Sequence, residues 1–129
     1  MKINHIGYMV KNIKKSTAAF IRLGYDMEQD IQEDHNRKAL IVFMVNDSYR
    51  IELVQPIDES SDYYPLLKKY RNSPYHICYC TEYLDKTIDD LRWGGYILVR
   101  PPEKAICLNG KRVAFLSCLG VQLIELVEM

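Results

Sequence analysis

Two histidines and two glutamates occupy matching places in two copies of one pattern within this chain of 129 residues. His5 and His76 share an offset of 71, and the tetrapeptide Ile-Glu-Leu-Val occurs twice, so that Glu52 and Glu125 share an offset of 73. Imidazole and carboxylate groups are donors that zinc, cobalt, nickel and iron accept. One such residue alone is more often hydrogen-bonded or solvated. The duplicated placement favours a divalent-metal site built from all four.

The repeat extends well beyond these four residues. The identical pairs at the offset of 71 are His5/His76, Ile6/Ile77, Tyr8/Tyr79, Lys15/Lys86, Gly24/Gly95 and Tyr25/Tyr96. At the offset of 73, Asn36 matches Asn109 and Lys38 matches Lys111. We interpret the pattern as an internal duplication within one domain, residues 1–129, with module one at 1–56, a linker at 57–73 and module two at 74–129.

Each module reads as strand, helix and three strands. Alternation predicts a strand at 2–10, and an N-cap at Asn12 opens a helix that ends at Gly24. Further strands are expected near 25–33, 38–46 and 49–55. The second copy predicts strands at 74–81, 96–100, 111–118 and 121–128 and a helix at 84–93. The linker has room for a short helix, and 101–110, which begins Pro101-Pro102, is expected to be an irregular loop. The predicted fold class is α+β, with two βαβββ modules and eight strands.

Strand alternation sorts the candidate ligands onto one face. The bulky apolar positions of these strands are expected to meet the helices. The opposite face then carries His5, Glu52, His76 and Glu125. Gly7 and Cys78 adjoin the histidines on this face, and their small side chains leave room for a ligand.

The composition excludes several classes of function. Apolar residues make up 48% of the chain and charged residues 26%, and 17 basic residues balance 17 acidic ones. This balance argues against a general nucleic-acid binder or a polybasic membrane binder. The longest apolar run, 39–45, is too short to span a membrane, and the first residues lack a signal-peptide core. A cytoplasmic protein is expected, and its four cysteines, Cys78, Cys80, Cys107 and Cys118, are expected to be reduced.

Five motifs carry a resemblance to a known family. They are I-N-H-I-G-Y at 3–8, R-I-E-L-V at 50–54, Y-H-I-C-Y at 75–79, K-R-V-A-F at 111–115 and L-I-E-L-V-E at 123–128. The chain resembles the vicinal-oxygen-chelate superfamily, and within it glyoxalase I and methylmalonyl-CoA epimerase. The resemblance implies a half-open, eight-stranded sheet cup around one divalent ion. It also implies nickel or cobalt, with zinc as the alternative, because the N-terminal segments of the zinc-type enzymes are absent.

The resemblance favours a glyoxalase I-type lyase. Such an enzyme converts the hemithioacetal of an α-keto aldehyde to a 2-hydroxyacyl thioester through an enediolate, with Glu125 and Glu52 as ligands and proton-transfer groups. The alternative is epimerisation of an acyl-CoA thioester. Epimerases commonly carry Gln in place of Glu52, and their additional glutamate base falls on Val42. The positions that contact glutathione in bacterial glyoxalases fall on Met9 and Pro56. The thiol part of the substrate could therefore be one other than glutathione.

The expected partner is a small thiol adduct or thioester, with no nucleic acid and no membrane, and a two-fold homodimer is expected. A non-catalytic binding member of the superfamily stays an alternative, and a dioxygenase fits less well because four protein ligands would crowd its metal. His35 is expected to be a solvated loop residue. The residues considered for binding an anionic substrate are Lys38, Arg50, Lys104, Lys111 and Arg112.

Overall fold

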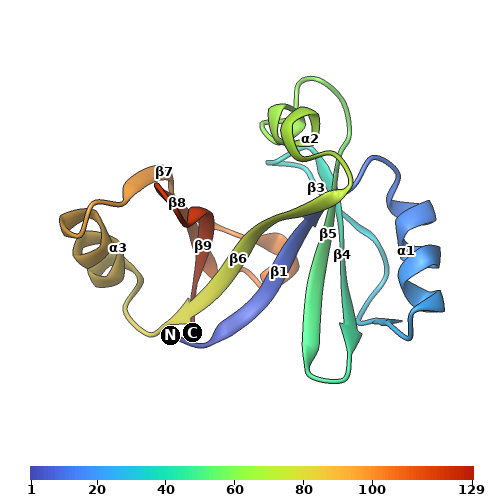
Figure 1. Ribbon diagram of the computed structural model, residues 1–129, viewed down its shortest axis with the longest axis horizontal. Helices are drawn as coiled ribbons and strands as arrows, with labels where there is room; N and C mark the ends of the chain where they lie inside the picture. The colour runs from blue at the N-terminus through green and yellow to red at the C-terminus, as the bar shows by residue number, and fades with distance from the viewer. The chain divides into compact units, whose positions relative to one another are not determined.

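The computed structural model describes residues 1–129 as two compact units, one of residues 5–75 and one of residues 1–4 with 76–129. Nine strands form an open mixed sheet with three α-helices, which confirms the predicted α+β class (Figure 1). The ninth strand arises because the segment predicted as one strand at 25–33 forms two short ones. None of the helices is long and apolar enough to cross a membrane.

The unit of residues 5–75 holds the first copy of the pattern. Its elements are β1 (Ile3–Met9), α1 (Ile13–Arg22), β2 (Asp26–Met27), β3 (Gln32–Asp34), β4 (Ala39–Asn46), β5 (Tyr49–Pro56) and α2 (Tyr64–Tyr70). The strands lie in the order β2-β4-β5-β1, and β3 pairs with β4. β1 runs parallel to β5, whereas β4 and β5 form an antiparallel hairpin. α2 confirms the short helix expected in the linker.

The second unit repeats this plan. Its elements are β6 (Ser73–Thr81), α3 (Leu84–Trp93), β7 (Ile97–Lys104), the 3-10 helix Ile106–Leu108, β8 (Arg112–Cys118) and β9 (Gln122–Glu128). The strand order is β6-β9-β8-β7, with β6 parallel to β9 and the other neighbours antiparallel. The first residues of the chain belong to this unit, and the backbone N–H of Cys80 donates to the carbonyl oxygen of Lys2 at 2.8 Å.

Local sequence signals set the limits of the two main helices. The side chain of Asn12 accepts a hydrogen bond from the backbone N–H of Lys15 at 3.1 Å, which confirms the predicted N-cap of α1. Gly24 and Gly95 follow α1 and α3 with φ angles of +100° and +103°, a conformation that favours glycine. The same local chemistry therefore stops both helices and turns the chain into the next strand.

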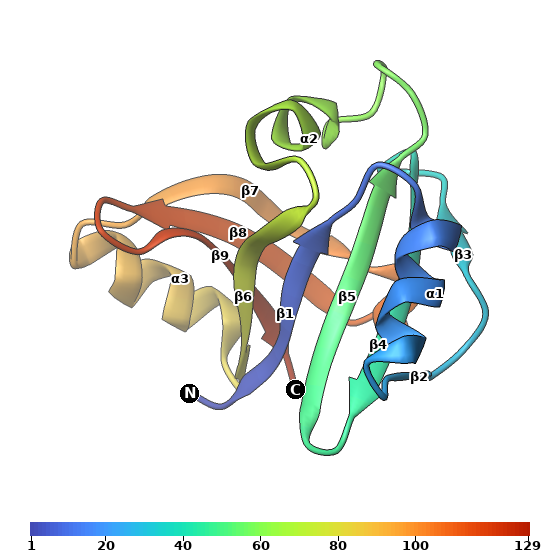
Figure 2. The same cartoon turned by 45° about the vertical axis from the view of Figure 1, so that its right-hand side comes forward.

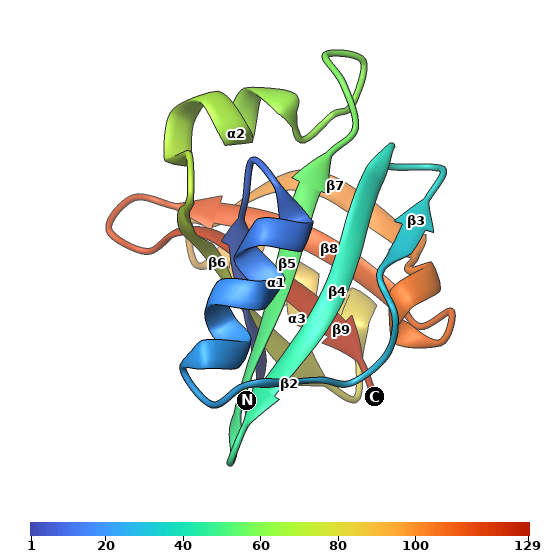
Figure 3. The ribbon, with the colours of Figure 1, turned by 90° about the vertical axis from the view of Figure 1, so that its right-hand side faces the viewer.

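Each helix covers one face of its own strands. α1 lies across β4 and β5 (Figure 3), and the buried cluster beneath it includes Val42, Met44, Ile51 and Leu53. α3 lies along the second set of strands (Figure 2). The buried cluster there is Leu84, Ile88, Ala114, Leu116, Ile124 and Leu126. We call the opposite face of the strands, in either unit, the site face.

The predicted loop at 101–110 is wrong in its first half. β7 continues through Pro101 and Pro102 to Lys104. A proline cannot donate to a strand neighbour, but β7 is the last strand in the order, so one of its edges needs no donor. The pairing of β7 with β8 shifts register twice, between Leu98 and Arg100 and between Arg100 and Glu103, which accommodates the prolines.

A surface network joins β8, β9 and α3. The backbone N–H of Arg112 donates to Glu128 at 2.9 Å, its Nε donates to the same carboxylate at 3.0 Å, and its guanidinium also pairs with Asp85 at 3.1 Å. The backbone hydrogen bond, followed by the side-chain bond and charge of Arg112, lowers the pKa of Glu128. Arg112, considered above for substrate binding, is therefore engaged in holding this unit together.

The lowered pKa of Glu128 predicts a pH-dependent contribution to stability. A carboxyl group with a lower pKa in the folded state stabilises the fold above its ordinary value of 4.5, and this contribution is lost as the pH falls through the lowered pKa. In denaturant unfolding of the wild type and Glu128→Gln, we expect the difference in free energy to be largest near neutral pH and to shrink in acid. A pH-independent difference would contradict the assignment.

Candidate metal centre

The first candidate pair lies on β1 and β5. In the parallel register of these strands Glu52 lies opposite Gly7, so Glu52 shares the site face with His5 and Gly7. Nε2 of His5 is 3.5 Å from Oε1 of Glu52, and both residues are buried. The structure therefore brings this His–Glu pair together on the face opposite α1.

The second pair repeats this arrangement on β6 and β9. Glu125 lies opposite Cys78 in the parallel register, and Cys78 shares its face with His76. Nε2 of His76 is 3.7 Å from Oε1 of Glu125, and both residues are buried. The two pairs thus have the same residue types, the same strand relation and nearly the same spacing.

The donor set fits a divalent ion. Two ligands about 2.1 Å from one ion, at the usual bond angles, lie roughly 3.0 to 3.6 Å apart, close to the separation within each pair. A buried carboxylate needs a partner that offsets its lost hydration, and a metal ion is one such partner. Each unit thus offers one buried imidazole and one buried carboxylate, and each of these residues presents one ligand atom.

A phenylalanine packs against each candidate ligand histidine. Phe43 on β4 lies opposite Glu52, and its ring meets the imidazole of His5 edge-on with centroids 5.1 Å apart. Phe115 on β8 lies opposite Glu125 and meets His76 in the same way at 5.4 Å. Both phenylalanines are almost fully buried. Each ring restricts the imidazole plane, as an outer-shell partner of a metal ligand does.

Replacing either phenylalanine by alanine is expected to weaken metal binding. Truncating a buried Phe typically costs about 3 to 5 kcal/mol of stability, and the histidine that it packs against is then held less firmly for metal binding. We expect both effects for Phe43→Ala and Phe115→Ala, measured by chemical denaturation and by competition with a chelator.

Phe20→Ala is the matched control for this pair of substitutions. Phe20 packs edge-on against Tyr8 and Tyr25 on the helix side of the first unit. This substitution should lower stability and leave the affinity of the folded protein for metal unchanged. Equal loss of metal in all three variants would mean that the phenylalanines act through stability alone.

Val42, the position to which the resemblance assigns the additional epimerase base, is not on the site face. Val42 lies opposite Leu53 and packs in the cluster under α1, whereas its neighbours Ile41 and Phe43 are on the site face. Phe43 is the structural counterpart of Phe115, because each lies opposite the glutamate of its own unit. A slip of one residue moves a side chain to the opposite face of a strand.

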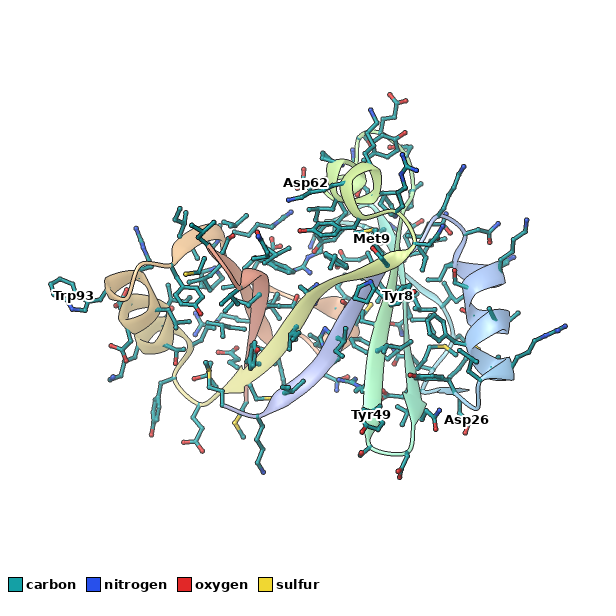
Figure 4. All side chains as sticks on the ribbon, in the orientation of Figure 1. Tyr8, Met9, Asp26, Tyr49, Asp62 and Trp93 are labelled. Carbon is teal, nitrogen blue, oxygen red and sulfur yellow. The ribbon has the colours of Figure 1, made fainter.

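The two hairpin turns differ in length, which changes the offset between the copies. Two residues, 47 and 48, join β4 to β5, where Tyr49 marks the end of the hairpin (Figure 4). Three residues, 119–121, join β8 to β9. The offset between copies is therefore 72 before the turn, for Phe43 and Phe115, and 73 after it, for Glu52 and Glu125. The site face of β4 still offers no carboxylate near Glu52, because Ile41 and Phe43 occupy it.

The remaining polar candidates have separate places. His35 is exposed, as expected, with Nδ1 2.5 Å from a carboxylate oxygen of Glu33. Lys38 donates to Oγ of Ser60 at 3.1 Å, and Lys104 and Lys111 are exposed. All four cysteines are free thiols, which agrees with the prediction. The sequence reasoning missed Phe43 and Phe115, although strand alternation outward from the two glutamates and the correct turn lengths would have found them.

Comparison with known proteins places the chain among related sequences and folds. The ethylmalonyl-CoA/methylmalonyl-CoA epimerase of Cereibacter sphaeroides is 26% identical over 117 residues, covering 89% of this chain and 87% of that protein. A methylmalonyl-CoA epimerase from Mycobacterium tuberculosis shares the fold, with a TM-score of 0.83, 23% identity and coverage of 98% of this chain and 86% of that one.

A further solved structure is a variant of Streptomyces coelicolor methylmalonyl-CoA epimerase in complex with 2-nitronate-propionyl-CoA. It matches with a TM-score of 0.81 and 25% identity, covering 99% of this chain and 94% of that one. The sequence model of the Glyoxalase/Bleomycin resistance protein/Dioxygenase superfamily matches residues 4–115. The match spans most of the chain and agrees with the resemblance found in its motifs. This chain belongs to the Glyoxalase/Bleomycin resistance protein/Dioxygenase superfamily.

Proposed function

We propose that this protein is a divalent-metal-dependent enzyme that epimerises an acyl-CoA thioester at the carbon next to the thioester carbonyl. The observation that carries the proposal is the buried His–Glu pair repeated on the site face of both units. The likeness to acyl-CoA epimerases in sequence and fold supports the substrate class. On this proposal the glyoxalase I reaction becomes the second candidate.

The proposed metal site uses His5, Glu52, His76 and Glu125 as ligands of one ion. When bound, a divalent ion supplies Lewis-acid stabilisation of the negative charge that develops on the carbonyl oxygen. The histidines contribute neutral nitrogen donors, and the glutamates offset the charge of the ion. The identity of the ion remains a prediction, namely nickel or cobalt, with zinc as the alternative.

The two glutamates are also the proposed proton-transfer groups. Epimerisation requires one group to take the α-proton on one side of the carbon and another to return a proton on the other side. Glu52 and Glu125 come from duplicated strands and are the carboxylates of the two pairs. The proposal assigns both proton transfers to these two glutamates, and β4 presents the apolar Ile41 and Phe43 beside Glu52.

The glyoxalase-type reaction is the second candidate because it needs a single proton-transfer group. That reaction moves a proton between neighbouring carbons of a hemithioacetal, so one of the two glutamates suffices. Both candidates thus share the metal site and the first proton removal. They differ in the carbon that receives the proton.

One experiment separates the two candidates. The metal-loaded protein is incubated in deuterated buffer with methylmalonyl-CoA of one configuration and, separately, with the hemithioacetal of methylglyoxal. The proposal expects deuterium at the α-carbon of the thioester together with inversion, and slow or no turnover of the hemithioacetal. Turnover of the hemithioacetal alone would establish the second candidate, and inertness toward both would favour a non-catalytic binding protein.

The expected homodimer also stays a prediction. Sedimentation at micromolar concentration should show a species of twice the chain mass. A strict monomer under these conditions would contradict it.

A further inference from the structure

Arg50 is the charged residue closest in sequence to Glu52 on the site face of β5. It lies opposite Val45, two residues before Glu52, so its side chain shares the face of the candidate ligand. The guanidinium carbon is 4.0 Å from the centroid of the Phe43 ring, and the same ring packs edge-on against His5. A single phenyl ring therefore separates this cation from the imidazole of a candidate metal ligand.

Glu28 holds the guanidinium in place. Its carboxylate accepts a hydrogen bond from Nε of Arg50 at 2.5 Å, and its backbone N–H donates to the carbonyl oxygen of Phe43 at 2.9 Å. The side chains of Arg50 and Glu28 are 26% and 34% exposed, so a ligand in solution can reach them. The guanidinium of arginine is a planar fork of N–H donors, a group that matches the geometry of a carboxylate.

The second unit places its arginine on a different strand. The position two residues before Glu125 is Leu123, which lies opposite Ser117. Arg100 on β7 lies opposite Phe115 and pairs with Glu103 at 3.1 Å. Arg50 is the arginine that shares a strand with a candidate ligand glutamate, two residues away.

We infer that Arg50 binds a carboxylate of the substrate's acyl group and thereby selects acidic acyl thioesters over neutral ones. The inference rests on the proposed function for the thioester and adds the residue that recognises the charge of the acyl group. Glu28 acts as a positioning residue for Arg50.

Binding of two thioesters tests this assignment. Methylmalonyl-CoA and propionyl-CoA carry the same coenzyme and differ in the acyl carboxylate. Each is titrated by calorimetry into the metal-loaded wild type, Arg50→Gln and Arg22→Gln. The last variant removes an exposed cation from the final turn of α1 and serves as the control. We expect Arg50→Gln to weaken methylmalonyl-CoA binding about 10- to 100-fold, the usual effect of losing a charge-assisted hydrogen bond, with little change for propionyl-CoA.

Two results would overturn the inference. Unchanged binding in Arg50→Gln would show that the guanidinium does not contact the substrate, and equal weakening of both thioesters would assign it to the phosphates of the coenzyme. Metal content and circular dichroism must match the wild type. If Arg50→Gln does not fold, Arg50→Lys takes its place and should weaken methylmalonyl-CoA binding about tenfold, because the planar fork is lost.

Failure of the proposed function is distinguishable from failure of this inference. If the wild type binds neither thioester, the substrate class of the proposed function is wrong. Malonate then becomes the probe with the same variants. Weaker malonate binding in Arg50→Gln, with wild-type malonate binding in Arg22→Gln, would support Arg50 as a carboxylate site. Unchanged malonate binding in Arg50→Gln would refute it.

Discussion

The His5→Ala and His76→Ala variants should each lose the bound metal ion almost completely. The proposed site draws one imidazole from each unit, so removal of either histidine leaves three donors and a buried carboxylate without its neighbour. Loss of an outer-shell partner already costs about 10- to 100-fold in metal affinity, and loss of a ligand should exceed this. Elemental analysis of the dialysed proteins should give one ion per wild-type chain and almost none in the variants.

His35→Ala is the matched control, because it removes a histidine that is exposed and paired with Glu33. It should keep the full metal content. Stoichiometry also distinguishes a shared site from two separate ones. Two ions in the wild type and one in each ligand variant would show that each His–Glu pair binds its own ion, and this result would contradict the proposed four-ligand site.

Glu125→Gln and Glu52→Gln should abolish epimerisation and leave much of the metal in place. An amide oxygen still coordinates a metal, but it does not accept the α-proton, and loss of a general base costs about 10²- to 10⁴-fold in rate. A two-base reaction adds a sharper expectation. Each variant keeps one base, so it should still exchange the α-proton of one configuration of methylmalonyl-CoA with solvent deuterium without inverting it. The two variants should act on opposite configurations.

The control for these variants is Glu128→Gln, which alters a β9 carboxylate three residues from Glu125 that is engaged with Arg112. It should epimerise at the wild-type rate at neutral pH. If both site variants exchange the same configuration, one glutamate alone moves the proton and the two-base assignment is wrong. If both keep full activity, neither glutamate is a base.

Duplication made the candidate ligand pairs predictable from the sequence. Alternation places the His of the first strand and the Glu of the last strand of each copy on the same face, and the structure has each pair on the face opposite the helix of its own unit. The helix limits were equally accessible, because Asn12, Gly24 and Gly95 act through their own backbone and near neighbours. Local signals of this kind need no knowledge of the tertiary fold.

Features that depend on partners distant in sequence were not predictable in the same way. The correspondence of Phe43 with Phe115 depends on hairpin turns that differ by one residue between the copies, so a constant offset of 73 does not pair these phenylalanines. β7 passes through Pro101 and Pro102 because it ends the strand order, which local propensity does not reveal. The contact of Glu28 with Arg50 likewise depends on the backbone hydrogen bond from Glu28 to Phe43 of β4, which joins residues distant in sequence.

Because each unit contributes one histidine and one glutamate, an ion held by all four ligands is released when either unit unfolds. Binding free energy then counts toward the stability of both units at once. At a free ion concentration of about 100 times the Kd, this linkage adds about 2.7 kcal/mol to the folded state. On the proposed four-ligand site, the ion would therefore couple the unfolding of the two halves of the duplicated chain, and the concentration of free ion would set the strength of this coupling.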